Sequence, residues 1–141
     1  MNVHPYGMQV TLNYPFEQTI TAVTEVLKEQ GFGILTEINV QETLKKKLAV
    51  EFRRYLILGA CNPPLAYQAL RNELEIGLLM PCNVIVYEAE DAGHTVVSIA
   101  DPLAMMGIAA APALFTMAEQ AQTKLKLALT QLEQLAEPPA V

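Results

Sequence analysis

The stretch VIVYEAEDAGHTVVSI, residues 84–99, decides the fold. Two runs rich in valine and isoleucine, residues 84–88 and 95–99, flank the turn sequence at residues 91–93. Two such runs joined by a short connection that contains glycine are typical of a β-hairpin. The stretch therefore predicts two neighbouring antiparallel strands, and the proline of Asp101-Pro102 marks the end of the second one.

Further strands are expected upstream of the hairpin. Residues 8–13 alternate apolar and polar side chains, which is the pattern of a strand with one buried face. Residues 32–40 and 52–58 are rich in apolar and β-branched residues, so each predicts another strand. Residues 78–80 predict a short extended segment, which Pro81 separates from the hairpin.

Three helices are expected among the strands. The first is amphipathic, because its apolar residues recur at spacings of four, three and four: Phe16, Ile20, Val23 and Leu27. Residues 41–47 predict a short helix that exposes its three lysines. Residues 59–64 are expected to form a turn that connects the preceding strand to a third helix at residues 65–72. Asn62 is the expected N-cap of this helix, and Pro63 is its expected first helical residue.

The last predicted element is a long helix with one apolar seam. Its apolar residues alternate spacings of four and three: Leu114, Ala118, Ala121, Leu125, Ala128, Leu132 and Leu135. Three heptads are too few to specify a coiled coil, so we expect the seam to pack against the sheet. The alternative is a dimer seam through Leu125, Leu132 and Leu135.

Together these elements predict one α+β domain over residues 1–141, with a mainly antiparallel sheet and helices packed on one face. Its core is expected at about residues 8–136, and residues 137–141 read as a frayed tail. A chain of 141 residues with 52% hydrophobic and 17% charged residues has the size and composition of a folded globular domain.

Charge and hydropathy narrow the expected surroundings and partners. The net charge of −6, with basic residues mostly scattered, argues against a nucleic-acid partner. The N-terminus lacks the pattern of a secretory signal, and no apolar stretch reaches the length of about 20 residues that a membrane helix needs. We therefore expect a cytoplasmic protein without a membrane segment, in which both cysteines are free thiols.

The candidate site consists of two Cys-Asn pairs. Cys61-Asn62 lies at a strand-to-helix junction, and Cys82-Asn83 lies at the start of a strand, so the two cysteines could meet at one rim of the sheet. A helix N-terminus favours negative charge, so the pKa of Cys61 is expected to be lowered. The simpler interpretation is that both are small buried hydrophobic residues, which is what a free cysteine usually is.

A metal site at the two cysteines is a second interpretation. Thiolates of Cys61 and Cys82 near Met105, Met106 or His94 would suit a soft ion such as Cu(I) or Zn(II). However, the sequence contains no Cys-x-x-Cys or His-x-x-x-His spacing, and a closed zinc site needs about four ligands. Methionine more commonly fills a gap in the core, and a histidine beside a turn is more commonly solvated.

Standard enzyme motifs are absent from the sequence. There is no dinucleotide-binding glycine motif and no phosphate-binding loop, and the arginine that a thiol phosphatase carries six places after its cysteine is replaced by Tyr67. The sequence therefore favours a binding module over an enzyme.

Several segments together resemble the 302 family of domains of unknown function. They are residues 31–40 (GFGILTEINV), 58–63 (LGACNP), 66–70 (AYQAL), 78–88 (LLMPCNVIVYE) and 101–102 (DP). The resemblance begins at about Tyr14 and reaches the C-terminal helix. It implies a β-α-β(4)-α arrangement, often as a homodimer, and brings no established reaction, substrate or cofactor. Members often carry aspartate at the position of Asn39, so a site that requires a carboxylate there is not expected.

Two functional hypotheses follow. The leading one is a homodimeric, non-enzymatic binding module in which the rim near Cys61, Asn62, Cys82 and Asn83 holds a small ligand or a soft ion. The alternative is a thiol-dependent enzyme or a redox sensor, with Cys61 as the reactive thiol and Cys82 as its resolving partner.

Overall fold

The structure, a computed structural model, describes residues 1–91, 93–109 and 111–136. Its strands are β1 (Asn2–His4), β2 (Gly7–Leu12), β3 (Gly33–Asn39), β4 (Tyr55–Cys61), β5 (Cys82–Glu88) and β6 (Thr95–Ala100). Its helices are α1 (Phe16–Glu29), α2 (Val40–Leu48), α3 (Pro63–Asn72), α4 (Pro102–Ala109) and α5 (Phe115–Ala136), with 3-10 turns η1 (Leu74–Leu79) and η2 (Pro112–Leu114). The frayed tail expected at residues 137–141 lies outside the described residues.

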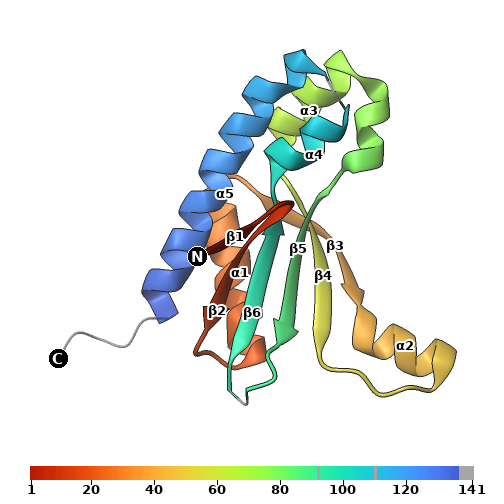
Figure 1. The fold of residues 1–141 in the computed structure, drawn as a ribbon, viewed down its shortest axis with the longest axis vertical. Helices are drawn as coiled ribbons and strands as arrows, with labels where there is room; N and C mark the ends of the chain where they lie inside the picture. The colour runs from red at the N-terminus through yellow and green to blue at the C-terminus, as the bar shows by residue number, and fades with distance from the viewer. Residues whose placement is uncertain (92, 110, 137–141) are drawn as a thin grey trace.

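The described strands form one six-stranded sheet in the order β1-β2-β6-β5-β4-β3 (Figure 1). Every neighbouring pair is antiparallel. The predicted hairpin is the pair β5–β6, in which Val84 lies opposite Ile99 and Glu88 lies opposite Thr95. The mainly antiparallel sheet expected from the sequence is therefore confirmed, and β2-α1-β3-β4-β5-β6-α5 follows the β-α-β(4)-α outline with additional short elements.

Helices α1 and α5 pack against one face of the sheet, as expected for this α+β class (Figure 1). Strand residues that alternate toward this face are buried, including Val10, Leu58, Val86 and Val97. They meet buried residues of the two helices, including Val23, Leu27, Leu129 and Leu132. Helices α3 and α4 and the first turns of α5 gather beyond one end of the sheet (Figure 1).

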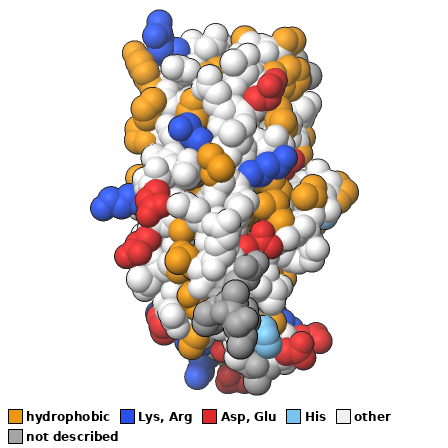
Figure 2. Space-filling view, turned by 90° about the vertical axis from the view of Figure 1, so that its left-hand side faces the viewer, with side chains coloured by type: hydrophobic (Ala, Val, Ile, Leu, Met, Phe, Trp, Pro, Cys, Tyr) orange, Lys and Arg blue, Asp and Glu red, His pale blue; other side chains and the backbone are white. Residues whose placement is uncertain are grey.

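The apolar seam of α5 packs inside the domain. Leu125 and Leu132 are 0% and 1% exposed and belong to the main core, so the alternative of a dimer seam through them is wrong. Leu135 is exposed, and its carbonyl oxygen accepts a hydrogen bond from the Tyr14 hydroxyl at 2.6 Å. Figure 2 faces the side along which α5 runs and shows acidic, basic and apolar side chains interspersed there.

The structure departs from the sequence expectations near the ends of two strands. Residues 59–64 are not a turn as a whole, because β4 continues to Cys61. Pairing explains this extension: Gly59 lies opposite Asn83 of β5, and Cys61 lies opposite Gly33 of β3. Leu78 and Leu79 belong to the 3-10 turn η1 and are not extended.

Two further elements were not predicted from the sequence. Strand β1 pairs with β2 at the edge of the sheet, and α4 precedes the long helix. Within the described ranges, no helix combines the length and the apolar character that crossing a membrane requires.

Candidate functional site

Asn62 joins the ends of two helices at the rim of the sheet. Its side-chain oxygen accepts a hydrogen bond from the Leu65 N–H at 3.3 Å, which caps α3 as predicted. Its side-chain amide donates to the carbonyl oxygen of Gln30 at 3.4 Å, where α1 ends. At Gly31, φ is +84° and an added Cβ would lie 2.9 Å from Asn62 Nδ2, so glycine is needed beside this junction. Asn62 therefore has a structural role.

A cavity of about 310 Å³ lies next to this junction. Its walls are the ends of β4 and β5, together with α3, η1, α4 and the first half of α5. The four residues that the sequence singled out, Cys61, Asn62, Cys82 and Asn83, all border it. Most of the remaining lining is apolar, for example Ala66, Leu79, Met106, Met117 and Leu125.

The two cysteines lie at the same end of neighbouring strands but on different faces of the sheet. Cys82 lies directly opposite Ala60, so its side chain shares the buried face of the sheet. Cys61 is the next residue along β4, and strand alternation directs its side chain to the other face. Both are free and half-buried. The strand ends therefore meet as expected, whereas the thiols do not share one face.

The thiols are poorly suited to act as thiolates at neutral pH. Burial, with a smaller effect of the nearby Asp101 charge, raises the pKa of Cys82 to about 12, and its Sγ donates to the Ala100 carbonyl oxygen at 3.7 Å.

Burial also raises the pKa of Cys61, and this corrects the lowered pKa expected from the neighbouring helix N-terminus. Pro63 and Pro64 carry no N–H, and the N–H of Leu65 is bonded to Asn62, so the start of α3 has no free donor among these residues to stabilise a thiolate.

The proposed soft-ion ligands are only partly brought together. Met105 and Met106 of α4 border the same cavity as the cysteines. His94 lies elsewhere, next to the β5–β6 turn, and lines a different hollow. In the part of the chain that the structure describes, no three or more His, Cys, Asp or Glu side chains are grouped so that they could hold a metal ion.

Sequence reasoning missed Met80, Met117 and the wall that α4 forms. Asp101 positions this wall: its Oδ1 accepts hydrogen bonds from the Leu103 N–H at 2.9 Å and from Gln122 Nε2 at 3.0 Å, which ties the start of α4 to α5. Every residue of α4 is uncharged, yet none is buried. The sequence offers only the uncharged run of residues 102–109 as a signal for this wall, because the incomplete burial of the helix is visible only in the folded chain.

The hollow that His94 lines is wider, at about 790 Å³, and is open to solvent. Charges of both signs line it, and its two arginines are already engaged: Arg54 forms an ion pair with Glu17 and lies 4.2 Å above the Phe16 ring centre, and Arg53 lies 3.9 Å from Glu90. This mixed surface is less suited to a specific ligand than the apolar cavity.

Comparison with known proteins identifies the family. The sequence matches the family model "Domain of unknown function DUF302" over residues 8–132. The chain belongs to the DUF302 family. The family resemblance expected from the sequence is therefore confirmed, and the matched range contains all four Cys-Asn residues.

A solved DUF302 structure has the same fold. It is the crystal structure of an uncharacterized conserved protein DUF302 from Bacillus stearothermophilus, with 30% sequence identity and a TM-score of 0.81. The similarity covers 89% of this chain and 97% of that one. No curated protein matches the sequence significantly.

Proposed function

We propose that this DUF302 protein is a non-catalytic binding module that holds a small, weakly hydrated ligand in the cavity beside Asn62. The cavity itself carries the proposal. Its volume of about 310 Å³ lies at the lower end of the usual range for ligand sites, roughly 300–1,000 Å³. Its predominantly apolar lining is also typical of such sites.

The chemistry of the lining supports a ligand without a strongly hydrated charge. Among the described residues, the cavity wall includes no acidic or basic side chain. The amide of Asn62 is already engaged by Leu65 and Gln30, and Asn83 is exposed. A strongly hydrated ion would lose its water here without adequate replacement partners, whereas an apolar or soft ligand would not.

Binding of the neutral, apolar dye N-phenylnaphthylamine tests this proposal. The dye should fluoresce on binding to the reduced wild-type protein, and Ala66→Phe should weaken binding because residue 66 lines the cavity. Gln68→Phe is the matched control, since residue 68 lies on the same helix but is exposed. Equal dye binding by both variants and the wild type would contradict a site in this cavity.

We also propose that the protein is a homodimer that pairs through the open face of its sheet. Ile38, Ile57 and Ile85 form a row across β3, β4 and β5 on the face opposite α1 and α5. Next to this row, the rings of Tyr55 and Tyr87 stack with centres 5.4 Å apart. A second copy offers the same uncharged residues, so two chains of net charge −6 can meet here without opposing like charges.

A further inference from the structure

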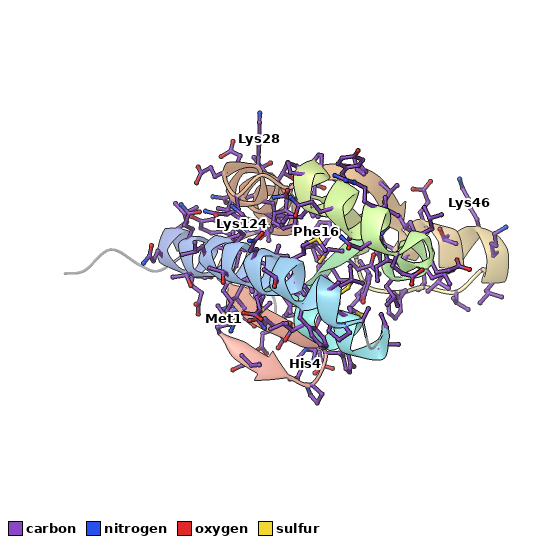
Figure 3. All side chains as sticks on the ribbon, turned by 90° about the horizontal axis from the view of Figure 1, so that it is seen from above. Met1, His4, Phe16, Lys28, Lys46 and Lys124 are labelled. Atoms are coloured by element: carbon purple, nitrogen blue, oxygen red, sulfur yellow. The ribbon has the colours of Figure 1, made fainter. Side chains whose placement is uncertain are left out.

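The cavity gathers most of the sulfur atoms of the protein. The chain has two cysteines and six methionines. Both cysteines and four methionines border the cavity: Cys61, Cys82, Met80, Met105, Met106 and Met117. All six are half-buried, so they are neither sealed in the core nor free in solvent. Figure 3 looks down on this end of the molecule and shows sulfur atoms in yellow near the centre of the view.

Three of these methionines pack against one small cluster of buried residues. Met80 follows η1, Met106 belongs to α4, and Met117 belongs to α5. All three side chains pack against the same group of buried residues, which are Ala69, Ile76 and Leu114. Separate segments of the chain thus bring three methionines to the lining of one cavity.

We infer that the ligand of this cavity is a soft monovalent metal ion, Cu(I), bound by the thioethers of Met80, Met106 and Met117. This inference rests on the proposed binding function and names its ligand class. Thioether sulfur selects Cu(I) among biological metal ions, because both partners are soft and polarisable. A thioether carries no proton at neutral pH, so binding requires no deprotonation.

The surrounding charge suits a monovalent cation. Asp101, whose chain neighbours Ala100 and Pro102 line the cavity, supplies a negative charge close to it. Zn(II) fits less well, because it prefers thiolate, imidazole and carboxylate ligands, and the described residues hold no cluster of three such groups.

Met8 shows how a methionine that only packs in the core is placed in this protein. Met8 is 0% exposed and lies in the main core, whereas each cavity methionine remains half-buried beside open volume. Methionines that only fill gaps would be expected to resemble Met8. The contrast supplies a matched control, because Met→Leu removes a sulfur and nearly conserves side-chain volume at either place.

Titration of the full-length, reduced protein with Cu(I) under anaerobic conditions tests the inference, with bicinchoninate as the competing chelator. The wild type should bind one Cu(I) per chain and gain thermal stability by mass action. The double variant Met106→Leu/Met117→Leu should lower Cu(I) affinity by more than about tenfold, since even outer-shell changes at metal sites cost that much. Met8→Leu should leave the affinity unchanged.

The outcomes separate this inference from the proposed function. If the double variant holds Cu(I) as tightly as the wild type, or if Met8→Leu loses as much affinity, the thioether site is wrong. If the wild type binds N-phenylnaphthylamine in the cavity but no Cu(I), the inference fails and the binding module stands. If Ala66→Phe leaves dye binding unchanged, the cavity site itself is contradicted, whatever the Cu(I) result.

Discussion

The substitution Ala66→Leu fills part of the cavity and should stabilise the protein. Residue 66 is half-buried on α3 and lines the cavity. Leucine and alanine both favour helix, so α3 itself should change little. The three added carbons would contribute about 2 kcal/mol if all were buried, at roughly 0.8 kcal/mol each. Because the site is half-buried, we expect about 1 kcal/mol, within the usual range for cavity filling of about 0.5–2 kcal/mol.

Urea denaturation measures this change in the free energy of unfolding, and Ala128→Leu is the control. Ala128 is 1% exposed in the main core, so the same added carbons have no free volume there and should destabilise the protein by about 1–3 kcal/mol. Opposite signs for the two variants would support an open cavity beside Ala66. A destabilisation by Ala66→Leu as large as that by Ala128→Leu would show that residue 66 does not border open volume.

Further predictions concern the core, the helix cap, the thiols and the dimer. Leu125→Ala should lower the free energy of unfolding by about 2–5 kcal/mol in urea, because Leu125 is fully buried between the core and the cavity; a loss well below this range would contradict that packing. Asn62→Ala should cost about 0.5–2 kcal/mol in the same assay, and Asn62→Asp should recover part of the loss because a carboxylate can still cap α3. Iodoacetamide should label Cys82 more slowly than Cys61 at mildly alkaline pH. Because the raised pKa favours the protonated Cys82 thiol in the folded state, its contribution to stability should be complete below pH 9.0 and lost as the pH rises toward about 12, and Cys82→Ser should lack this loss in pH-dependent urea melts. Ile57→Lys should convert the proposed homodimer into a monomer in sedimentation velocity, and an unchanged sedimentation coefficient would argue against the open sheet face.

The features that could be predicted from the sequence have local signals. The β5–β6 hairpin follows from two β-branched runs around a glycine turn, and α5 follows from its four-three apolar spacing. The cap at Asn62 follows from the Asn-Pro pair that begins α3. Each signal lies within a few residues of the structure that it specifies.

The end of β4 could not be predicted in this way. Gly59 resembled the start of a turn, but it extends β4 because Asn83 of β5 lies opposite it. Its lack of a side chain is required by tertiary neighbours: an added Cβ would collide with Thr36 Oγ1 and would lie 2.8 Å from Pro81 Cγ. Strand pairing therefore decided a boundary that local sequence favoured otherwise.

The cavity also depends on contacts between distant segments. The two Cys-Asn pairs both lie at strand ends, and all four of their residues border one cavity. Met80 and Met117 were missed, since a single methionine in an apolar stretch looks the same whether it fills a core or lines a cavity. The opposite orientation of Cys61 and Cys82 follows from the β4–β5 register, which only the folded chain reveals.

The most direct measurement records the methyl signals of the six methionines by NMR while N-phenylnaphthylamine is added to the wild-type protein. The signals of the four cavity methionines should shift together with one affinity: Met80, Met105, Met106 and Met117. The signals of Met1, which is exposed at the N-terminus, and of Met8, which is buried in the core, should not move. A shift confined to Met1 or Met8, or no shift at saturating dye, would contradict a ligand site in this cavity.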